Sequence, residues 1–333
     1  MFGCTLLGMK TSSEMSPPTT LLEAVTYFAD NDRALAFMVQ MRWPNGVTCP
    51  ACEDANPIFL KTRRIWKCRE CKRQFSVKLG TVFEDSPLGL DKWLPALWML
   101  ANCRNGISSY ELARDLKVTQ KTAWFMLGRI RLAMDIAHAE PFSGEVEADE
   151  TFIGGKAKNM HKKVLARSPL LGTSVKGKTA VMGLLQRSKE KGGSRVKAMV
   201  IHGTKRSMIE PKIHANVEAG SAVYTDALPS YNRLDATYTH STVDHGAGEW
   251  VNARGAHTNG LENFWSCLKR GIKGTYISID PFHVFRYVAE QSFRFNVRQQ
   301  TEPNRFAAVA RAIVGKRLTY IELTGADLPV ATT

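Results

Sequence analysis

Two cysteine pairs constrain the N-terminal part of this chain more tightly than any other feature of the sequence. Cys49 and Cys52 form one pair, Cys68 and Cys71 form the other, and fifteen residues separate the pairs. Because each short turn can direct both of its sulfur atoms inward, two such pairs present four thiolates to one tetrahedral Zn²⁺. The spacing therefore predicts a zinc ribbon over residues 46–80, in which a structural zinc replaces the core that so few residues cannot build.

The predicted ribbon also carries short strands and many basic side chains. Two apolar segments, 58–60 and 65–67, alternate with basic residues, as short strands would. A redox role for either cysteine pair is less favoured because no strand–helix–strand pattern surrounds it. A solvated face would explain the charges, but so dense a cluster on a small module favours contact with phosphates. The DNA-binding candidates of the ribbon are Arg63, Arg64, Lys72 and Arg73.

The length and charge of the chain bound its class. With 333 residues, it is expected to form two or three domains. Its 45 Lys and Arg residues exceed its 31 Asp and Glu residues by 14, which favours a polyanionic partner, nucleic acid before an anionic membrane surface. No segment is long enough to span a bilayer and no signal peptide is evident. The odd number of cysteines, seven, then argues for a reducing cytosol and a cytoplasmic protein.

Helical periodicity dominates two regions before the middle of the chain. The first pattern predicts a helix over 21–43 that ends at a clear turn. In the second region, Ser108 and Glu111 are spaced for a capping box, and a tight turn near 117–119 separates two helices. This pair resembles a helix-turn-helix, although an ordinary helical hairpin explains the pattern nearly as well. The base-contact candidates at the start of its second helix are Gln120, Lys121 and Thr122.

Three acids after residue 140 lie on separate predicted elements. Residues 144–153 alternate as a strand does, which places Glu145, Glu147 and Asp149 on one face. Such an assembly of like charges is costly unless water or cations neutralise it. After two more strands and a helix, a further strand ends at Asp226, and another suggested strand follows at 238–243.

Glu262 follows Asp226 after 35 residues, on a helix with an apolar stripe. Glu262 and Lys269 are seven residues apart and therefore project from the same face of that helix. Asn259 is a good N-cap residue, and Glu262 then occupies the place of a capping-box acid. Taken alone, the helix favours this capping role for Glu262 over catalysis.

The order of these elements favours a different role for the acids. A mixed sheet whose adjacent strands present two acids, with a third acid on a helix across their edge, is how a ribonuclease-H-like fold holds two divalent metals. Hard oxygen ligands suit Mg²⁺ or Mn²⁺ better than zinc. Asp149, Asp226 and Glu262 are therefore the candidate catalytic metal ligands. Each alone has an ordinary explanation, such as a solvated side chain or an acid at a strand end.

Together these motifs resemble the DDE-type transposases of bacterial insertion sequences, in particular the ISXO-type group with an N-terminal zinc ribbon. The resemblance covers roughly residues 45–300 and rests on several motifs in combination. They are the four cysteines, the segments 146–156, 224–226 and 257–269, Tyr276, and residues 294–296.

The resemblance implies roles for individual residues. It makes Asp149 and Asp226 the first two metal-binding acids and places Lys269 in contact with DNA near the reactive phosphate. Members of the group have Asn or Glu at the third position, and this chain offers Asn259 and Glu262 one turn apart. The spacing and the better ligand properties of a carboxylate favour Glu262. Asn259 would then cap the helix.

The implied function is transposition. The protein would bind double-stranded DNA at the terminal inverted repeats of an insertion sequence, cleave it with Mg²⁺ or Mn²⁺ to free a 3′-OH, and transfer that end into target DNA. Lys156, at the start of a basic loop that we expect to be mobile without DNA, and Arg270 are further DNA-binding candidates. A homo-oligomer is expected, because two DNA ends must be paired. The alternatives are a non-catalytic zinc-ribbon regulator or inactive transposase, and a cellular nuclease of the same fold.

The predicted organisation is that of an α+β multidomain protein. When bound to DNA it would be associated with the bacterial nucleoid. In chain order, we expect a flexible leader at 1–20, a helical segment at 21–45, the zinc ribbon at 46–80, a helical DNA-binding segment at 85–140, a ribonuclease-H-like mixed α/β catalytic domain at 141–300 and a C-terminal tail at 301–333.

Overall fold

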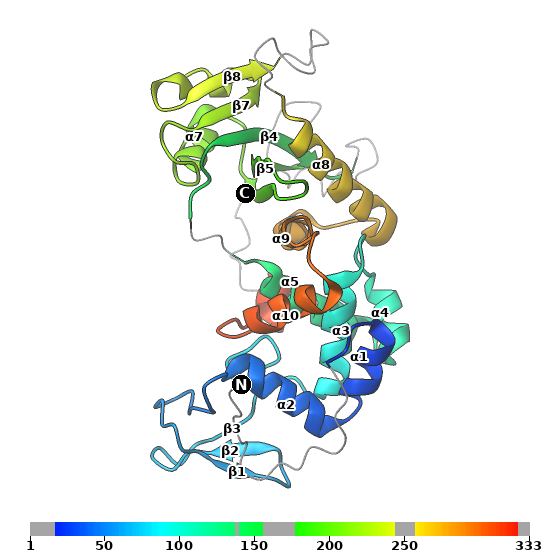
Figure 1. Cartoon of the computed structure of the whole chain (residues 1–333). Helices are drawn as coiled ribbons and strands as arrows, with labels where there is room; N and C mark the ends of the chain where they lie inside the picture. The colour runs from blue at the N-terminus through cyan, green and yellow to red at the C-terminus, as the bar shows by residue number, and fades with distance from the viewer. Residues whose placement is uncertain (1–16, 137–139, 156–176, 244–256, 326–333) are drawn as a thin grey trace.

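A computed structural model describes residues 17–136, 140–155, 177–243 and 257–325. Lys156 and the rest of the predicted basic loop up to residue 176 lie outside these ranges. Figure 1 shows a small sheet at one end of the molecule, a larger mixed sheet at the other, and a group of helices between them. No helix among the described residues has both the length and the apolar character needed to cross a membrane.

The small N-terminal sheet is the core of the predicted ribbon. Strands β1 (Ile58–Leu60), β2 (Ile65–Lys67) and β3 (Gln74–Phe75) pair antiparallel in that order. The first two strands were predicted from the sequence and are confirmed. The ring of Trp66 stacks on that of Phe75 with centroids 6.0 Å apart, which gives this small module its apolar centre.

The four cysteines of the ribbon meet at one point. Their sulfur atoms all lie within 4.8 Å of one another. The Sγ atoms of Cys49 and Cys71 are 3.7 Å apart, and those of Cys52 and Cys68 are 3.4 Å apart. A tetrahedral zinc with bonds of about 2.3 Å has sulfur–sulfur edges of about 3.8 Å, so these four thiols fit such an ion. The predicted four-cysteine metal-binding arrangement is confirmed.

The helix predicted over 21–43 is wrong in one respect, since two helices occupy this stretch. Two residues separate helix α1 (Leu21–Phe28) from helix α2 (Asn31–Arg42). The carboxylate of Asp30 accepts hydrogen bonds from the backbone N–H groups of the first turn of α2, including that of Asp32 at 2.8 Å. This N-cap starts a new helix and breaks the old one.

The central helices share one core. Helices α3 (Leu90–Asn102), α4 (Ser109–Leu116), α5 (Gln120–Met134) and α10 (Glu302–Ala312) bury apolar residues against α1, α2 and the ribbon. The Ser108 hydroxyl accepts a hydrogen bond from the backbone N–H of Glu111 at 3.1 Å, so α4 begins where the sequence predicted.

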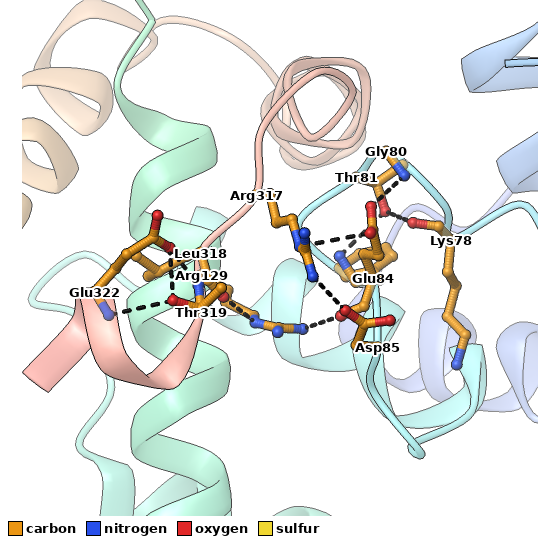
Figure 2. A network of polar contacts seen from close by, with 11 residues as sticks. Lys78, Gly80, Thr81, Glu84, Asp85, Arg129, Arg317, Leu318, Thr319 and Glu322 are labelled. Carbon is orange, nitrogen blue, oxygen red and sulfur yellow. Dashed lines mark hydrogen bonds and ion pairs between the residues drawn. The ribbon is translucent and has the colours of Figure 1, made fainter. Parts of the chain in front are cut away.

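The C-terminal segment packs across α5 and the chain that leaves the ribbon (Figure 2). Arg317 forms an ion pair with Asp85 at 2.6 Å, and Arg129 of α5 donates a hydrogen bond to the carbonyl of Leu318 at 3.0 Å. A short helix, α11 (Tyr320–Thr324), then begins with a capping box. The region after residue 301 therefore contributes to the helical core.

The second sheet has the five strands that the sequence predicted, in the predicted order along the chain. Its strands lie side by side in the order β6-β5-β4-β7-β8. Strand β4 pairs antiparallel with β5 and parallel with β7, and β7 pairs parallel with β8. Their bounds are β4 (Glu145–Ile153), β5 (Thr179–Gln186), β6 (Arg195–Ile201), β7 (Ala222–Asp226) and β8 (Thr239–Val243).

Helices cover both faces of this sheet. Helix α7 (Arg206–His214) packs on one face, while α8 (Asn259–Gly271) and α9 (Val284–Asn296) pack on the other (Figure 1). The helix expected before the strand that ends at Asp226 is thus present as α7. The described residues also include the short helical turns η2 (Pro229–Tyr231), η3 (Leu234–Ala236), the π-helical η5 (Ile272–Tyr276) and η6 (Pro281–His283).

We predict that the purified protein holds one zinc ion per chain and that Cys68→Ser loses it. The ribbon strands of the variant should unfold, because metal binding supplies most of the free energy that keeps this small module folded. Bound metal is measured by elemental analysis, and local unfolding by proteolysis within residues 46–80. Cys103→Ser, which removes a thiol outside the ribbon, should keep the zinc. Full zinc content in Cys68→Ser would contradict the assignment.

Candidate metal centre

Three carboxylates meet where β7 ends beside β4. Asp149 and Glu150 lie on β4, and Asp226 is the last residue of β7. The pairing of the two strands extends only to Glu147 and Tyr224, so the next residues of β4 border the open end of β7. The oxygen atoms that the three acids offer lie within 4.8 Å of one another. The structure therefore brings together the two aspartates that the sequence placed on neighbouring strands.

Glu150 is a member of this group that the sequence did not single out. Alternation along a strand directs it to the face opposite Asp149. There the hydroxyl of Tyr231, on η2, donates a hydrogen bond to the Glu150 carboxylate. The side chain of Asp226 accepts a hydrogen bond at 3.1 Å from the backbone N–H of Leu228, which begins the turn that carries Tyr231 back over β4. No motif signals such a contact, and the only sequence hint is the position of Glu150 next to Asp149.

The carboxyl groups are hard to ionise without a cation. Burial raises the pKa of Asp149 to about 6 and the pKa of Glu150 to about 8. The nearby charge of Asp226 raises both pKa values further, while hydrogen bonds from Trp265 and Tyr231 oppose the shifts. A divalent cation would neutralise this cluster, and clustered carboxylate oxygens are the donors that Mg²⁺ and Mn²⁺ prefer. The donor set therefore fits such a metal.

Helix α8 forms the other wall of the site. An open cavity of about 570 Å³ lies between this helix and the acids of β4. Glu262 and Lys269 both line it, as their seven-residue spacing predicted. The carboxylate of Glu262 faces the same cavity but is not part of the group within 4.8 Å. The remaining lining residues are Asp149, Glu150, Thr151, Trp265, Ser266, Arg270 and Lys273.

One side chain of α8 contacts the acid group directly. The indole Nε1 of Trp265 donates a hydrogen bond to Oδ2 of Asp149 at 2.9 Å. Gly183 on β5 makes room for the indole, because a Cβ atom at this position would lie 2.6 Å from the ring. A donor of this kind fixes the orientation of a carboxylate that binds a metal. Trp265, one of the buried apolar residues of α8, therefore also orients Asp149.

The beginning of α8 differs from the prediction. Asn259 was expected to be the N-cap residue, but Thr258 occupies that position, and Asn259 is the exposed first residue of the helix. The capping acceptor comes instead from the sheet: Oε2 of Glu147 accepts a hydrogen bond from the backbone N–H of Leu261 at 2.9 Å. Gly260 permits this approach, because a Cβ atom there would lie 2.9 Å from the same carboxylate.

The row of acids on β4 is neutralised in part by one arginine. Arg187 forms ion pairs with Glu147 at 2.8 Å and with Glu145 at 3.2 Å. The Glu147 side chain is only 1% exposed, whereas that of Glu145 is 56% exposed. The arginine thus compensates the first two acids of this face. Asp149 lies further along the strand and lines the cavity.

The positive side chains of the cavity lie on α8. Lys269 and Arg270 are exposed, next to the acid-lined wall. Reduced contact with water lowers the pKa of Lys269, and the charge of Asp149 opposes that shift. Both residues can contact an anion that enters the cavity.

The DNA-binding candidates of the ribbon lie far from the acids. Figure 1 places the ribbon at the end of the molecule opposite the mixed sheet. Arg63, Arg64, Lys72 and Arg73 are all exposed. Arg64 forms an ion pair with Asp32 of α2 at 2.7 Å, which attaches the ribbon to the N-terminal helices. These four ribbon residues therefore form a basic surface that is separate from the acid site.

The candidates at the start of α5 lie in its first turn, between the ribbon and the mixed sheet. Gln120 donates a hydrogen bond to the hydroxyl of Ser109 at 2.8 Å, and Lys121 lies 4.8 Å from the ring centre of Tyr320. The backbone N–H of Thr122 is capped by Thr119. Most of the helix after this turn is buried, so only its beginning can approach a groove of DNA.

Comparison with known proteins gives matches over most of the chain. Residues 141–296 match the family model of the ISXO2-like transposase domain, and residues 29–74 match that of the transposase zinc-ribbon domain. An uncharacterized protein in transposable element ISH50 of Halobacterium salinarum is 30% identical over 253 residues, which cover 73% of this chain and 83% of the relative.

Two further matches are more limited. An uncharacterized transposase-like protein of Haemophilus influenzae is 30% identical over 103 residues, covering 31% of this chain and 81% of that protein. The crystal structure of the Mos1 strand transfer complex is similar over 68% of this chain and 79% of that chain, with 12% identity and a TM-score of 0.21. A TM-score this low does not establish a shared fold.

We predict that Glu147→Ala lowers the free energy of unfolding by about 3 kcal/mol. The substitution removes the cap of α8 and leaves Arg187 partly buried without its main partner. Glu145→Ala is the matched control, because it removes a partner of the same arginine from an exposed position and should cost less than about 1 kcal/mol. Urea unfolding followed by tryptophan fluorescence measures both. Equal losses in the two variants would contradict the anchoring role of Glu147.

We also predict that stability in magnesium-free buffer falls as the pH rises through about 6 and then about 8. A carboxyl group whose pKa is higher in the folded than in the unfolded chain stabilises the fold at low pH and loses that effect as it ionises. Added Mg²⁺ should therefore raise the unfolding temperature more at pH 8 than at pH 5. Asp149→Asn should weaken this dependence, and an equal effect of Mg²⁺ at both pH values would contradict it.

Proposed function

Because this chain belongs to the insertion-sequence transposases that combine a zinc ribbon with an ISXO2-like transposase domain, we propose that it cleaves DNA at the ends of an insertion sequence and joins them to target DNA. The observation that carries this proposal is the meeting of Asp149 and Asp226 beside a cavity that Glu262 and Lys269 also line. Acidic ligands and a cation around one cavity are what phosphodiester chemistry requires.

The fold we propose for residues 141–300 is ribonuclease-H-like. Its support is the five-stranded mixed sheet, in which Asp149 and Asp226 lie on neighbouring parallel strands. Helix α8 packs across these strands and carries Glu262. Two acids from a sheet and a third from a helix across its edge are the arrangement expected of that fold.

The metal ligands we propose are Asp149, Asp226 and Glu262, with Glu150 close enough to offer a further oxygen. Divalent cations bound there would polarise the scissile phosphate and make an attacking water or 3′-hydroxyl more reactive. Trp265 holds one oxygen of Asp149, and Asp149 lines the cavity.

The cationic side chains on α8 complement the acids. Lys269 lies on the cavity wall opposite β4, where it can contact the phosphate group on which negative charge develops. Arg270 extends the same surface and would contact a neighbouring phosphate of the strand. We also propose that Lys156 contacts DNA; this residue lies outside the described ranges.

The remaining DNA contacts we propose come from the ribbon and from the α4–α5 pair. The exposed ribbon arginines and lysines would contact phosphates, which supply affinity without sequence information. The first turn of α5, residues 120–122, would contact base edges as the start of a helix-turn-helix recognition helix. Because two transposon ends must be brought together, we further propose that the active form contains at least two copies of the chain and acts in the cytoplasm, on the nucleoid.

We predict that cleavage of a duplex carrying the terminal inverted repeat depends on Mg²⁺ or Mn²⁺ and is lost in Asp226→Asn. Loss of a metal ligand removes several kcal/mol of transition-state stabilisation, so the rate should fall by at least about a thousandfold. Gel analysis of labelled DNA separates cleaved from joined products. A joined strand supports transposition, whereas a simple nick or digest would indicate a nuclease.

Asp235→Asn is the control for this experiment, because it changes an exposed carboxylate of the same part of the chain. Its cleavage rate should match that of the unmodified protein. Glu262→Gln should lose more activity than Asn259→Ala, and the reverse order would assign the third ligand to Asn259. Retention of metal-dependent cleavage in Asp226→Asn would refute the proposed site.

A further inference from the structure

The segment after α8 exposes an apolar side chain from a strained backbone. Ile277 is 78% exposed and has φ 64° and ψ −58°. The backbone N–H of Ser278 donates a hydrogen bond to the carbonyl of Tyr276 at 2.6 Å, which closes a γ-turn centred on Ile277. A γ-turn with positive φ is rare and strained, and a β-branched residue at its centre is an outlier.

Ile277 differs from the other residues with unusual backbone angles. Among the described residues, every other non-glycine residue with positive φ is polar or charged, as exposed turns usually are. These residues are Glu53, Arg64, Lys72, Asp85 and Lys117. A glycine at position 277 would adopt the same φ without strain and would expose no apolar surface. The stability of the turn therefore gives no reason for an isoleucine at position 277. Residues with strained backbone angles of this kind cluster at functional sites.

The neighbouring structure holds Ile277 in place. The π-helix η5 ends in a hydrogen bond of 2.7 Å from the Ile277 N–H to the carbonyl of Ile272. The hydroxyl of the preceding residue, Tyr276, donates to the buried carboxylate of Glu290. Gly106 packs against that hydroxyl so closely that a Cβ atom would lie 1.7 Å from it. Ile277 is thus a projecting side chain on a rigid base.

The position of Ile277 follows from the helix that precedes it. Lys269, Arg270 and Lys273 line the acid cavity from one side of α8 and η5, and all three are exposed. Position 277 follows this basic row in the chain, four residues after Lys273, as the C-cap of η5. Trp265 contacts Asp149, and twelve residues at about 1.5 Å each place Ile277 at most roughly 18 Å further along. At about 3.4 Å for each nucleotide step, this corresponds to at most about five base pairs.

We propose that Ile277 is a wedge that enters between neighbouring base pairs of the DNA bound along this basic row. Apolar side chains such as isoleucine partly unstack base steps when they insert, and they bend the duplex. The basic row argues for DNA as the occupant, because Lys269, Arg270 and Lys273 would contact the phosphates that lead to the wedge. This inference rests on the proposed function, since it takes the same DNA as its ligand.

The test uses the full-length protein and a duplex that carries the terminal inverted repeat. 2-Aminopurine replaces single bases on both sides of the cleavage point, because its fluorescence rises when it is unstacked. The unmodified protein should raise the fluorescence at one step within about five base pairs of the cleaved phosphate. Ile277→Ala should lose that increase, while Ile277→Leu, which keeps the apolar bulk, should retain it.

Two variants separate the wedge from a structural role. Ile277→Gly removes both the side chain and the strain, so it should lose the fluorescence increase without a fall in unfolding temperature. Leu22→Ala, which shortens a side chain that is 77% exposed on α1, should keep the increase. An Ile277→Ala protein that unstacks the duplex as well as the unmodified protein would overturn the wedge. So would an unchanged DNA signal with a loss of self-association, which would assign Ile277 to a contact between two copies.

Failure of the wedge and failure of the proposed function are distinguishable in the same assays. If the protein binds and cleaves the duplex without unstacking any base step, only the wedge is refuted. If it neither binds nor cleaves the terminal-repeat duplex, the proposed function and the wedge both fail.

Discussion

One buried carboxylate fixes the geometry on which the candidate site depends. Glu147 accepts a hydrogen bond from the first turn of α8 and forms an ion pair with Arg187. These two contacts set where the helix lies along the sheet. Trp265 can then reach Asp149, and Glu262 faces the same cavity. A shift of α8 by one turn would move every side chain of that wall by about 5.4 Å and separate it from the aspartates.

A second buried group connects the mixed sheet to the helices below it. Arg131 of α5 forms an ion pair of 2.5 Å with Glu290 of α9, and both side chains are almost fully buried. Arg294 and Tyr276 contact the same carboxylate. A buried ion pair contributes little net stability, and its best-supported use is to specify one arrangement among several. Here it fixes α5, whose first turn we propose contacts bases, relative to α9, the helix that packs on the mixed sheet.

The sequence was informative where a residue pattern directly reflects local geometry. The cysteine spacing predicted the four-cysteine group, and strand alternation with the chain order predicted that Asp149 and Asp226 would meet. It failed where a partner comes from a distant segment. Asn259 has the residue type of an N-cap, yet the capping oxygen comes from Glu147, more than a hundred residues earlier. The contact of Glu150 with Tyr231 depends on how a turn folds back, which alternation does not reveal.

The central claim is that Asp149, Asp226 and an acid on α8 hold divalent metals at one edge of the sheet. Anomalous diffraction from crystals soaked in Mn²⁺ tests it most directly. Two manganese peaks about 3.5–4 Å apart, between the aspartates and Glu262, are the expected result. Manganese bound elsewhere, or no bound manganese while the ribbon keeps its zinc, would contradict the account and leave a basic zinc-ribbon protein without this chemistry.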